Sequence, residues 1–265
     1  MRILVLLFTL AALLPLQGHA KAFDSVITTE ANVVFSVRDI SDLRDAWSDH
    51  PLVRDFSETS MDKMFESLFG WSGDGDGESG GGFGELLREF GLDETEFFEL
   101  FGDQAALALY NLPALLLQES ERPDLAILAN FSASAERLDE LMQIQFERNA
   151  RAQREINPAI EHEMVEERFM GETLHFDEVF DGEATYIEDG YALVDGVFIL
   201  ARPEARLRTL VESVKSGNER QISASLAYQR AREESGPVDL MLYLNLESTL
   251  PSLNAALLEK ARKGG

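Results

Sequence analysis

Cysteine is absent from this chain of 265 residues. Its absence excludes disulfide bonds, thiolate metal sites and cysteine nucleophiles. It also excludes a lipid anchor at the end of an export signal, because that attachment requires a cysteine. The chain must therefore be stabilised by its hydrophobic core, and its 45% of hydrophobic residues is ordinary for a globular protein.

Basic residues are scarce. Lys and Arg number 23 against 48 Asp and Glu, so the formal net charge is -25 at pH 7. Such a charge repels nucleic acids and anionic lipid surfaces, and it favours cations or basic partners. The chain also lacks the glycine patterns of phosphate-binding and dinucleotide-binding loops. We therefore expect no nucleic-acid partner.

Long apolar runs are missing except at the N-terminus. Arg2 precedes an apolar run at 3–14, and small residues follow, which is the pattern of a signal peptide. Cleavage is expected after Ala20, with Ala22 as the alternative, and the run is shorter than a typical membrane span. An uncleaved anchor is the competing interpretation. The sequence predicts an exported protein, periplasmic or extracellular, with signal peptide 1–20 and no transmembrane anchor after cleavage.

Apolar periodicity divides the rest of the chain into short strands and amphipathic helices. Strands are expected at 26–37, 105–110, 125–131 and 238–244. Helices are expected at 41–47, 61–69, 83–90, 93–101, 133–154, 203–214, 223–233 and 253–261.

A β-meander is expected at about 163–201, where turn dipeptides separate short β-rich runs. These dipeptides are Met170-Gly171, Asp181-Gly182, Asp189-Gly190 and Asp195-Gly196, although the last two are too close for both to be tight hairpins. We predict an α+β fold, with an antiparallel or mixed sheet and amphipathic helices mainly on one face. Residues 23–265 are expected to form a single domain, with two pseudo-repeated halves (23–155 and 156–265) as a variant of this organisation.

Residues 191–201 follow the pattern Tyr-x-x-x-Asp-Gly-x-x-x-Leu-Ala, with Asp195 and Gly196 at the turn, and lead into a short helix. Together with the strand–helix opening after the signal and a Gly-rich acidic loop, this run resembles a group of exported bacterial proteins of unknown function. The resemblance implies a non-enzymatic envelope protein and brings no catalytic residues.

The Gly-rich acidic loop at 74–85 is the best candidate for a metal site. Numbered as an EF-hand loop, it places Asp74, Asp76 and Glu78 at positions 1, 3 and 5 and Glu85 at position 12. Calcium takes six to eight oxygen ligands, which alternating acids and a final bidentate Glu supply. The sequence thus predicts a weak calcium site between two amphipathic helices.

The same loop departs from the EF-hand pattern. Ser79 stands at position 6, where the sharp turn favours glycine, and Gly81 stands where an apolar residue normally pairs with a second loop. A solvated acidic loop without metal is therefore the competing interpretation.

Ser79 also completes a Gly-x-Ser-x-Gly pattern, but the glycines and aspartates before it cannot form the strand that a nucleophile elbow needs. His162 begins a segment like a zinc motif, but Glu166 occupies the position of the second histidine, so an exposed polar β-segment is expected. Two neighbouring pairs, Glu166-Glu167 and Asp177-Glu178, could supply carboxylates for acid–base catalysis.

These observations favour a non-catalytic exported binding or scaffold protein with a protein partner in the envelope or the secreted fraction. Two alternatives stay open: a secreted hydrolase that uses Ser79 or a carboxylate pair, and a carrier that holds an apolar ligand between sheet and helices.

Overall fold

The computed structural model describes residues 22–38, 101–116, 122–131, 135–217, 220–236 and 240–263. The predicted signal peptide, the helices expected between 41 and 100 and the acidic loop at 74–85 lie outside the described residues.

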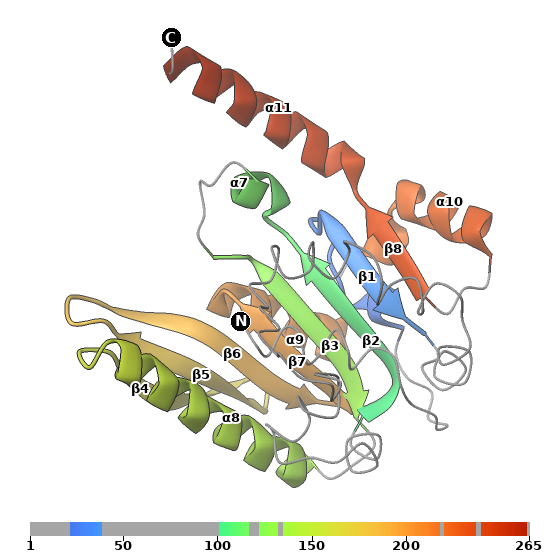
Figure 1. Cartoon of the computed structure of the whole chain (residues 1–265). Coiled ribbons are helices and arrows are strands. Elements are labelled where there is room, and N and C mark those ends of the chain that lie inside the picture. Colours follow the sequence, from blue (N-terminus) through green and yellow to red (C-terminus); the bar gives the residue numbers. More distant parts are fainter. Residues whose placement is uncertain are drawn as a thin grey trace, which may run out of the picture.

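Eight strands of the described chain form one sheet in the order β4-β5-β6-β7-β3-β2-β1-β8 (Figure 1). All neighbouring pairs are antiparallel. The strands are β1 (Val33–Val37), β2 (Phe101–Leu109), β3 (Leu125–Phe131), β4 (Glu161–Phe169), β5 (Glu172–Phe180), β6 (Thr185–Val194), β7 (Val197–Arg202) and β8 (Leu240–Leu244). The sheet and its helices confirm the predicted α+β fold.

The meander predicted at about 163–201 is formed by β4 to β7. Both residues of Met170-Gly171 and of Asp195-Gly196 have positive φ, as in the two-residue turns that suit the twist of a hairpin. The turn expected at Asp189-Gly190 is wrong, because both residues lie inside β6. There β6 carries a register shift against β5, so that Glu188 and Asp189 together oppose Asp177.

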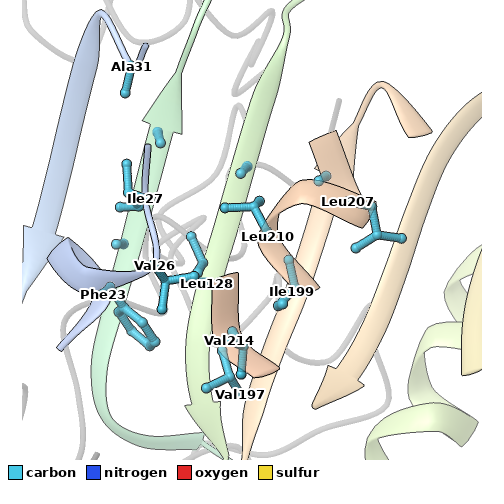
Figure 2. Close-up of a cluster of buried hydrophobic side chains, with 14 of the residues drawn as sticks. Phe23, Val26, Ile27, Ala31, Leu128, Val197, Ile199, Leu207, Leu210 and Val214 are labelled. Atoms are coloured by element: carbon cyan, nitrogen blue, oxygen red, sulfur yellow. The ribbon is translucent and has the colours of Figure 1, made fainter. Parts of the chain in front are cut away.

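Helix α9 (Glu204–Ser216) closes the main hydrophobic core. Leu207, Leu210, Val211 and Val214 are all fully buried on the helix face that meets the sheet. Strand residues that point to this face complete the core, and Figure 2 shows Leu128, Val197 and Ile199 among them.

Helix α8 (Ala135–Ile156) lies on the opposite face of the meander. In β5, Leu174 and Phe176 belong to the core under α9, whereas His175, which alternates with them, lies beside Asp139 of α8. Figure 1 shows α8 running along β4 and β5. The two helices thus cover different faces of the same strands, so α8 departs from the expectation that the helices lie mainly on one face.

The strand expected at 26–37 begins only at Val33. Before it, the chain forms η1 (Phe23–Ser25) and a buried segment in which Thr28 bridges to Gln221. Val26 and Ile27 are apolar because they fill the core under α9 rather than because they pair in the sheet. Phe101, expected at the end of a helix, begins β2.

The remaining elements are α7 (Leu112–Leu116), η2 (Ile222–Ala224), α10 (Leu226–Ser235) and α11 (Leu246–Lys263). Ser225 caps α10 through its side chain, and α11 begins several residues before the expected 253. None of the helices in the described ranges combines the length and the apolar character needed to cross a bilayer.

Candidate functional site

A small pocket lies between α8 and the strands of the meander. Its cavity of about 40 Å³ holds a few water molecules or one small ligand. It is lined by Met142, Phe146, Asn149, Met164, His175, Asp177, Asp189, Gly190, Tyr191 and Leu200. The lining is apolar in its middle and polar at both ends, because α8 and β4 place Met142, Phe146 and Met164 between two groups of ionisable side chains.

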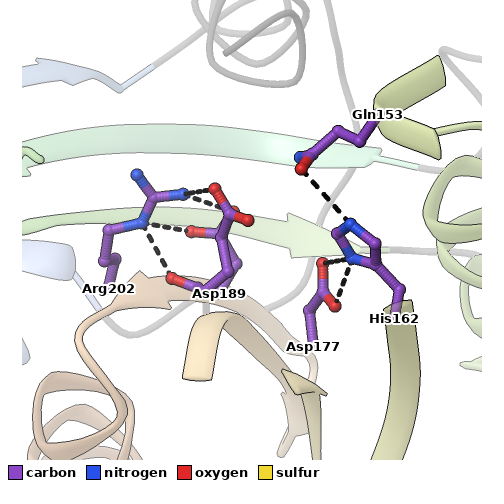
Figure 3. A network of polar contacts seen from close by, with 6 residues as sticks. Gln153, His162, Asp177, Asp189 and Arg202 are labelled. Atoms are coloured by element: carbon purple, nitrogen blue, oxygen red, sulfur yellow. Dashed lines mark hydrogen bonds and ion pairs between the residues drawn. The ribbon is translucent and has the colours of Figure 1, made fainter. Parts of the chain in front are cut away.

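His162 and Asp177 form the first polar group. The Nδ1 atom of His162 lies 2.9 Å from Oδ1 of Asp177 and its Nε2 atom lies 3.3 Å from Oε1 of Gln153 (Figure 3). The His162 side chain is fully buried, and its ring meets Phe146 edge-on at 6.2 Å between centroids. The expected exposed segment is therefore wrong at His162, which pins α8 to β4 and β5.

Arg202 holds the acidic bulge of β6 beside this group. Its Nε and Nη2 atoms donate to the two carboxylate oxygens of Asp189, each at 2.8 Å, and Nε also donates to the Glu188 carbonyl oxygen (Figure 3). Two parallel bonds of this kind fix the orientation of both side chains. Asp189 is thus neutralised by Arg202 at the edge of the pocket.

The carboxyl group of Asp177 is the most perturbed acid of the pocket. Burial raises its pKa to about 6, the His162 bond opposes this effect, and the negative charges of Glu188 and Asp189 add to it. An acid with such a pKa changes its protonation state at a higher pH than an ordinary aspartate.

His175 and Tyr191 form the second polar group, at the other end of the pocket. Their rings are stacked with 4.5 Å between centroids, and the Tyr191 hydroxyl donates to Asp139 of α8 at 2.6 Å. Burial and the Asp139 carboxylate raise the pKa of Tyr191, so the phenol keeps its proton.

The His175 side chain is only 11% exposed, and among the described residues its Nδ1 atom has no hydrogen-bond partner. The nearest charged oxygen, Oε1 of Glu166, lies 3.7 Å from Nδ1, and Nε2 lies 3.6 Å from Asp139. Both distances exceed a hydrogen bond. A buried polar atom without a protein partner is uncommon, so this nitrogen is available to a bound water or ligand.

Of the candidate site residues predicted from the sequence, some lie outside the described residues and two neighbours lie on opposite faces of the sheet. Asp74, Asp76, Glu78 and Glu85 lie outside the described residues, as does Ser79. Glu166 faces α8, whereas Glu167 bonds to Arg208 of α9 on the other face of the sheet. The members of this pair are thus separated by the sheet, as strand alternation requires.

The pocket residues carried one overlooked signal in the sequence. His162, Met164 and Glu166 alternate along one strand, and His175 and Asp177 alternate along the next, so all five side chains share one face. A methionine between a histidine and an acidic residue on one face of a strand is atypical of a face exposed to solvent. Only pairing with α8, which is distant in sequence, turns this face into a pocket.

Within the described ranges, no group of three or more His, Cys, Asp or Glu side chains is arranged to hold a metal ion. The pocket offers instead one unpaired histidine nitrogen, two thioethers and carboxylates at its ends.

The described residues form an α+β fold built on one antiparallel sheet, with a polar pocket under α8. Comparison of the chain with protein-family models, curated proteins and solved structures finds no match. A functional assignment therefore rests on the geometry of the pocket.

Proposed function

We propose that the protein is an exported, non-catalytic binding protein of the periplasm or cell envelope, and that it takes a small cation in the pocket under α8. The observation that carries this proposal is the buried Nδ1 atom of His175, a side chain that lines the pocket. This atom has no hydrogen-bond partner in the part of the chain that the structure describes.

The charge around the pocket favours a cation over an anion. Carboxylates outnumber guanidinium groups beside it: Asp139, Glu166, Asp177, Glu188 and Asp189 against Arg122 and Arg202. The net charge of the chain adds a long-range attraction of the same sign. The thioethers of Met142 and Met164 and the imidazole of His175 extend the choice to soft metal ions.

Binding is favoured over catalysis because the polar groups of the pocket other than His175 are held by one another. Asp189 is held by Arg202 and the Tyr191 hydroxyl is held by Asp139. The described lining residues include no serine, threonine or lysine that could act as a nucleophile. The cavity of about 40 Å³ is also too small for an acyl chain, so it lends no support to a carrier of apolar ligands.

The test is titration of the processed protein with Cu(I), Zn(II) and methylammonium, followed by nitrogen-15 NMR of the histidine rings and by thermal unfolding. We expect one of these cations to shift the His175 signals saturably and to raise the midpoint of unfolding. His175→Phe keeps a ring against Tyr191 and removes both nitrogens, so it should abolish the shift. His50→Phe is the control. If none of the three cations shifts the His175 signals, or if the response persists in His175→Phe, the proposal is contradicted.

We separately propose that the loop at 74–85 binds calcium. This proposal predicts a rise in the unfolding midpoint with millimolar calcium over EDTA, absent with magnesium and lost when Asp74→Ala is combined with Glu85→Ala. An equal response to both metals, or none, would make the loop an acidic linker.

A further inference from the structure

Three of the residues that line the pocket under α8 carry soft donor atoms. They are Met142 of α8, Met164 of β4 and His175 of β5, so they approach the cavity from the helix and from two strands. Thioether sulfur is a ligand that soft metal ions select and imidazole suits several transition metals, whereas calcium and magnesium require oxygen. The cavity of about 40 Å³ has room for one such ion.

The register of β4 and β5 places two of these donors close together. Met164 lies opposite Asp177 and Glu166 lies opposite His175, so Met164 and His175 are diagonal neighbours on the same face of the hairpin. Diagonal neighbours lie about 7–8 Å apart, a separation that long and aromatic side chains can bridge. One ion between a methionine and a histidine therefore fits this register.

Helix α8 brings Met142 to the same part of the sheet. Met142 follows Asp139 by three residues, and residues three apart share a face of a helix. Oδ1 of Asp139 lies 3.6 Å from Nε2 of His175 and accepts a hydrogen bond from Tyr191. Met142 is thus one turn of helix away from a residue that contacts His175.

His175 has one nitrogen available to a metal on the side of Met164. Nδ1 has no hydrogen-bond partner in the described part of the chain, and it points toward β4, where Oε1 of Glu166 lies 3.7 Å away. Nε2 can keep the proton because it faces the carboxylate of Asp139. A carboxylate behind the ring of a ligating histidine favours this arrangement and makes the other nitrogen more basic.

The carboxylates that line the pocket are held by other groups. Asp189 is paired with Arg202, and Asp177 is bonded to His162. Zinc takes four ligands in a tetrahedral arrangement, but the described residues contain no group of three or more His, Cys, Asp or Glu side chains arranged for a metal ion. The donors that remain are two thioethers and one imidazole, which are neutral and soft.

We propose that the cation of this pocket is Cu(I), held by the Sδ atoms of Met142 and Met164 and by Nδ1 of His175. This proposal rests on the proposed function and names the ion and its ligands. Thioether ligands select Cu(I) over harder divalent ions, and the flexible methionine side chains can adjust to it. The carboxylate of Glu166, beside Nδ1, balances the single charge of the ion.

The first test is an anaerobic titration of the processed protein with Cu(I) in competition with a chromophoric Cu(I) chelator. We expect a single tightly bound equivalent, and combining Met142→Leu with Met164→Leu should weaken its binding by at least about a hundredfold. Leucine is close to methionine in volume, so the fold should be kept. Met170→Leu, at a position 43% exposed in the turn between β4 and β5, is the matched control and should leave the affinity unchanged.

Carbon-13 NMR of the methionine methyl groups is a second measurement, which uses the wild-type protein. The signals of Met142 and Met164 should shift saturably with Cu(I), together with the ring signals of His175. The signal of Met170, outside the pocket, should stay in place.

The outcomes distinguish this proposal from the proposed function. If Zn(II) or methylammonium binds through His175 and Cu(I) binds no more tightly, the Cu(I) assignment is wrong and a cation site of another kind remains. The assignment is also wrong if Cu(I) binding is indifferent to the two leucine substitutions or leaves both methyl signals in place. If no cation shifts the His175 signals, the assignment and the proposed function fail together.

Discussion

Helices α9 and α8 cover opposite faces of the same meander, and they differ in how they meet it. On α9, Leu207, Leu210, Val211 and Val214 are completely buried against strand side chains. Both helices bury one polar residue, Ser213 on α9 and Gln145 on α8. The other buried residues of α8 are Leu138, Leu141 and the small Ala150, so α8 buries fewer large apolar side chains although it is the longer helix.

Under the proposed function, this difference assigns stability to one face of the sheet and binding to the other. The α9 face is an apolar core, whose contribution grows with the area removed from water. The α8 face is pinned by polar contacts at both ends, Asp139 to Tyr191 and Gln153 to His162, and leaves a pocket between them. Departures from simple apolar packing are expected where a protein binds something. Substitutions on the two faces should therefore differ in kind.

The largest effect is expected on the α9 face. Leu210→Ala should lower the free energy of unfolding by about 3–4 kcal/mol, because the cavity forms in a closely packed core. Leu141→Ala on α8 should lower it by about 1–2 kcal/mol, because this residue is not completely buried and lies on the face with the pocket. Urea unfolding of both variants measures the contrast. Equal losses would break the comparison and make α8 a full part of the core.

The next effect concerns Gly190, where the two faces meet. A Cβ atom added there would lie 2.5 Å from Cδ1 of Phe176 and 3.0 Å from Cδ2 of Leu207. Both neighbours are buried in the core between α9 and the sheet, so Gly190→Ala should cost about 1–3 kcal/mol by overpacking. Gly171→Ala is the contrasting variant: it meets no atom within 4 Å, and its penalty comes only from its φ of +88°. A Gly190→Ala variant as stable as the wild type would mean that Phe176 moves freely.

Gly190 also shows where sequence reasoning stops. The dipeptide Asp189-Gly190 resembles a turn, and local chemistry alone cannot distinguish a turn from a bulge in a close-packed strand. Met170-Gly171 and Asp195-Gly196 are turns in which both residues take positive φ, and the apolar spacing at 203–214 predicts α9. Alternation and helical period thus predicted the meander and α9.

The pocket was not predicted, for a different physical reason. Its polar ends join residues far apart in sequence, such as Asp139 with Tyr191. Each member of such a pair has an ordinary interpretation by itself, as an exposed helical acid or a strand tyrosine. Only the placement of α8 across the meander, which no local pattern encodes, brings them together.

A moderate, pH-dependent effect is expected at Asp177. Its pKa of about 6 in the folded protein exceeds the usual 3.8, so the native state binds this proton more tightly than the unfolded state. The stability that this group contributes is complete below about pH 4 and is lost as the pH rises through 6. Asp177→Asn imitates the protonated form. Between pH 4 and 7, its free energy of unfolding should therefore rise by about 1–2 kcal/mol relative to that of the wild type, after allowance for solvent screening.

Asp181 provides a control of opposite sign. Bonds from the backbone N–H groups of Ala184 and Glu183 lower the pKa of its carboxyl group in the turn between β5 and β6. Its contribution is therefore present above the usual pKa and lost as the pH falls. The free energy of unfolding of Asp181→Asn should be lower than that of the wild type at neutral pH, and the difference should disappear in acid. Urea unfolding as a function of pH measures both variants, and identical profiles would show that burial does not dominate at Asp177.

The smallest effect is expected at Tyr191. Tyr191→Phe keeps the ring stacked on His175 and removes only the hydroxyl that donates to Asp139. Asp139 is partly exposed and can be solvated instead, so the loss of stability should be about 1 kcal/mol. The informative measurement is local: amide hydrogen exchange should become faster in α8, which loses one of its polar pins, and stay unchanged in α9. Faster exchange in both helices would mean that the two faces open together, and the separation of stability from binding would then fail.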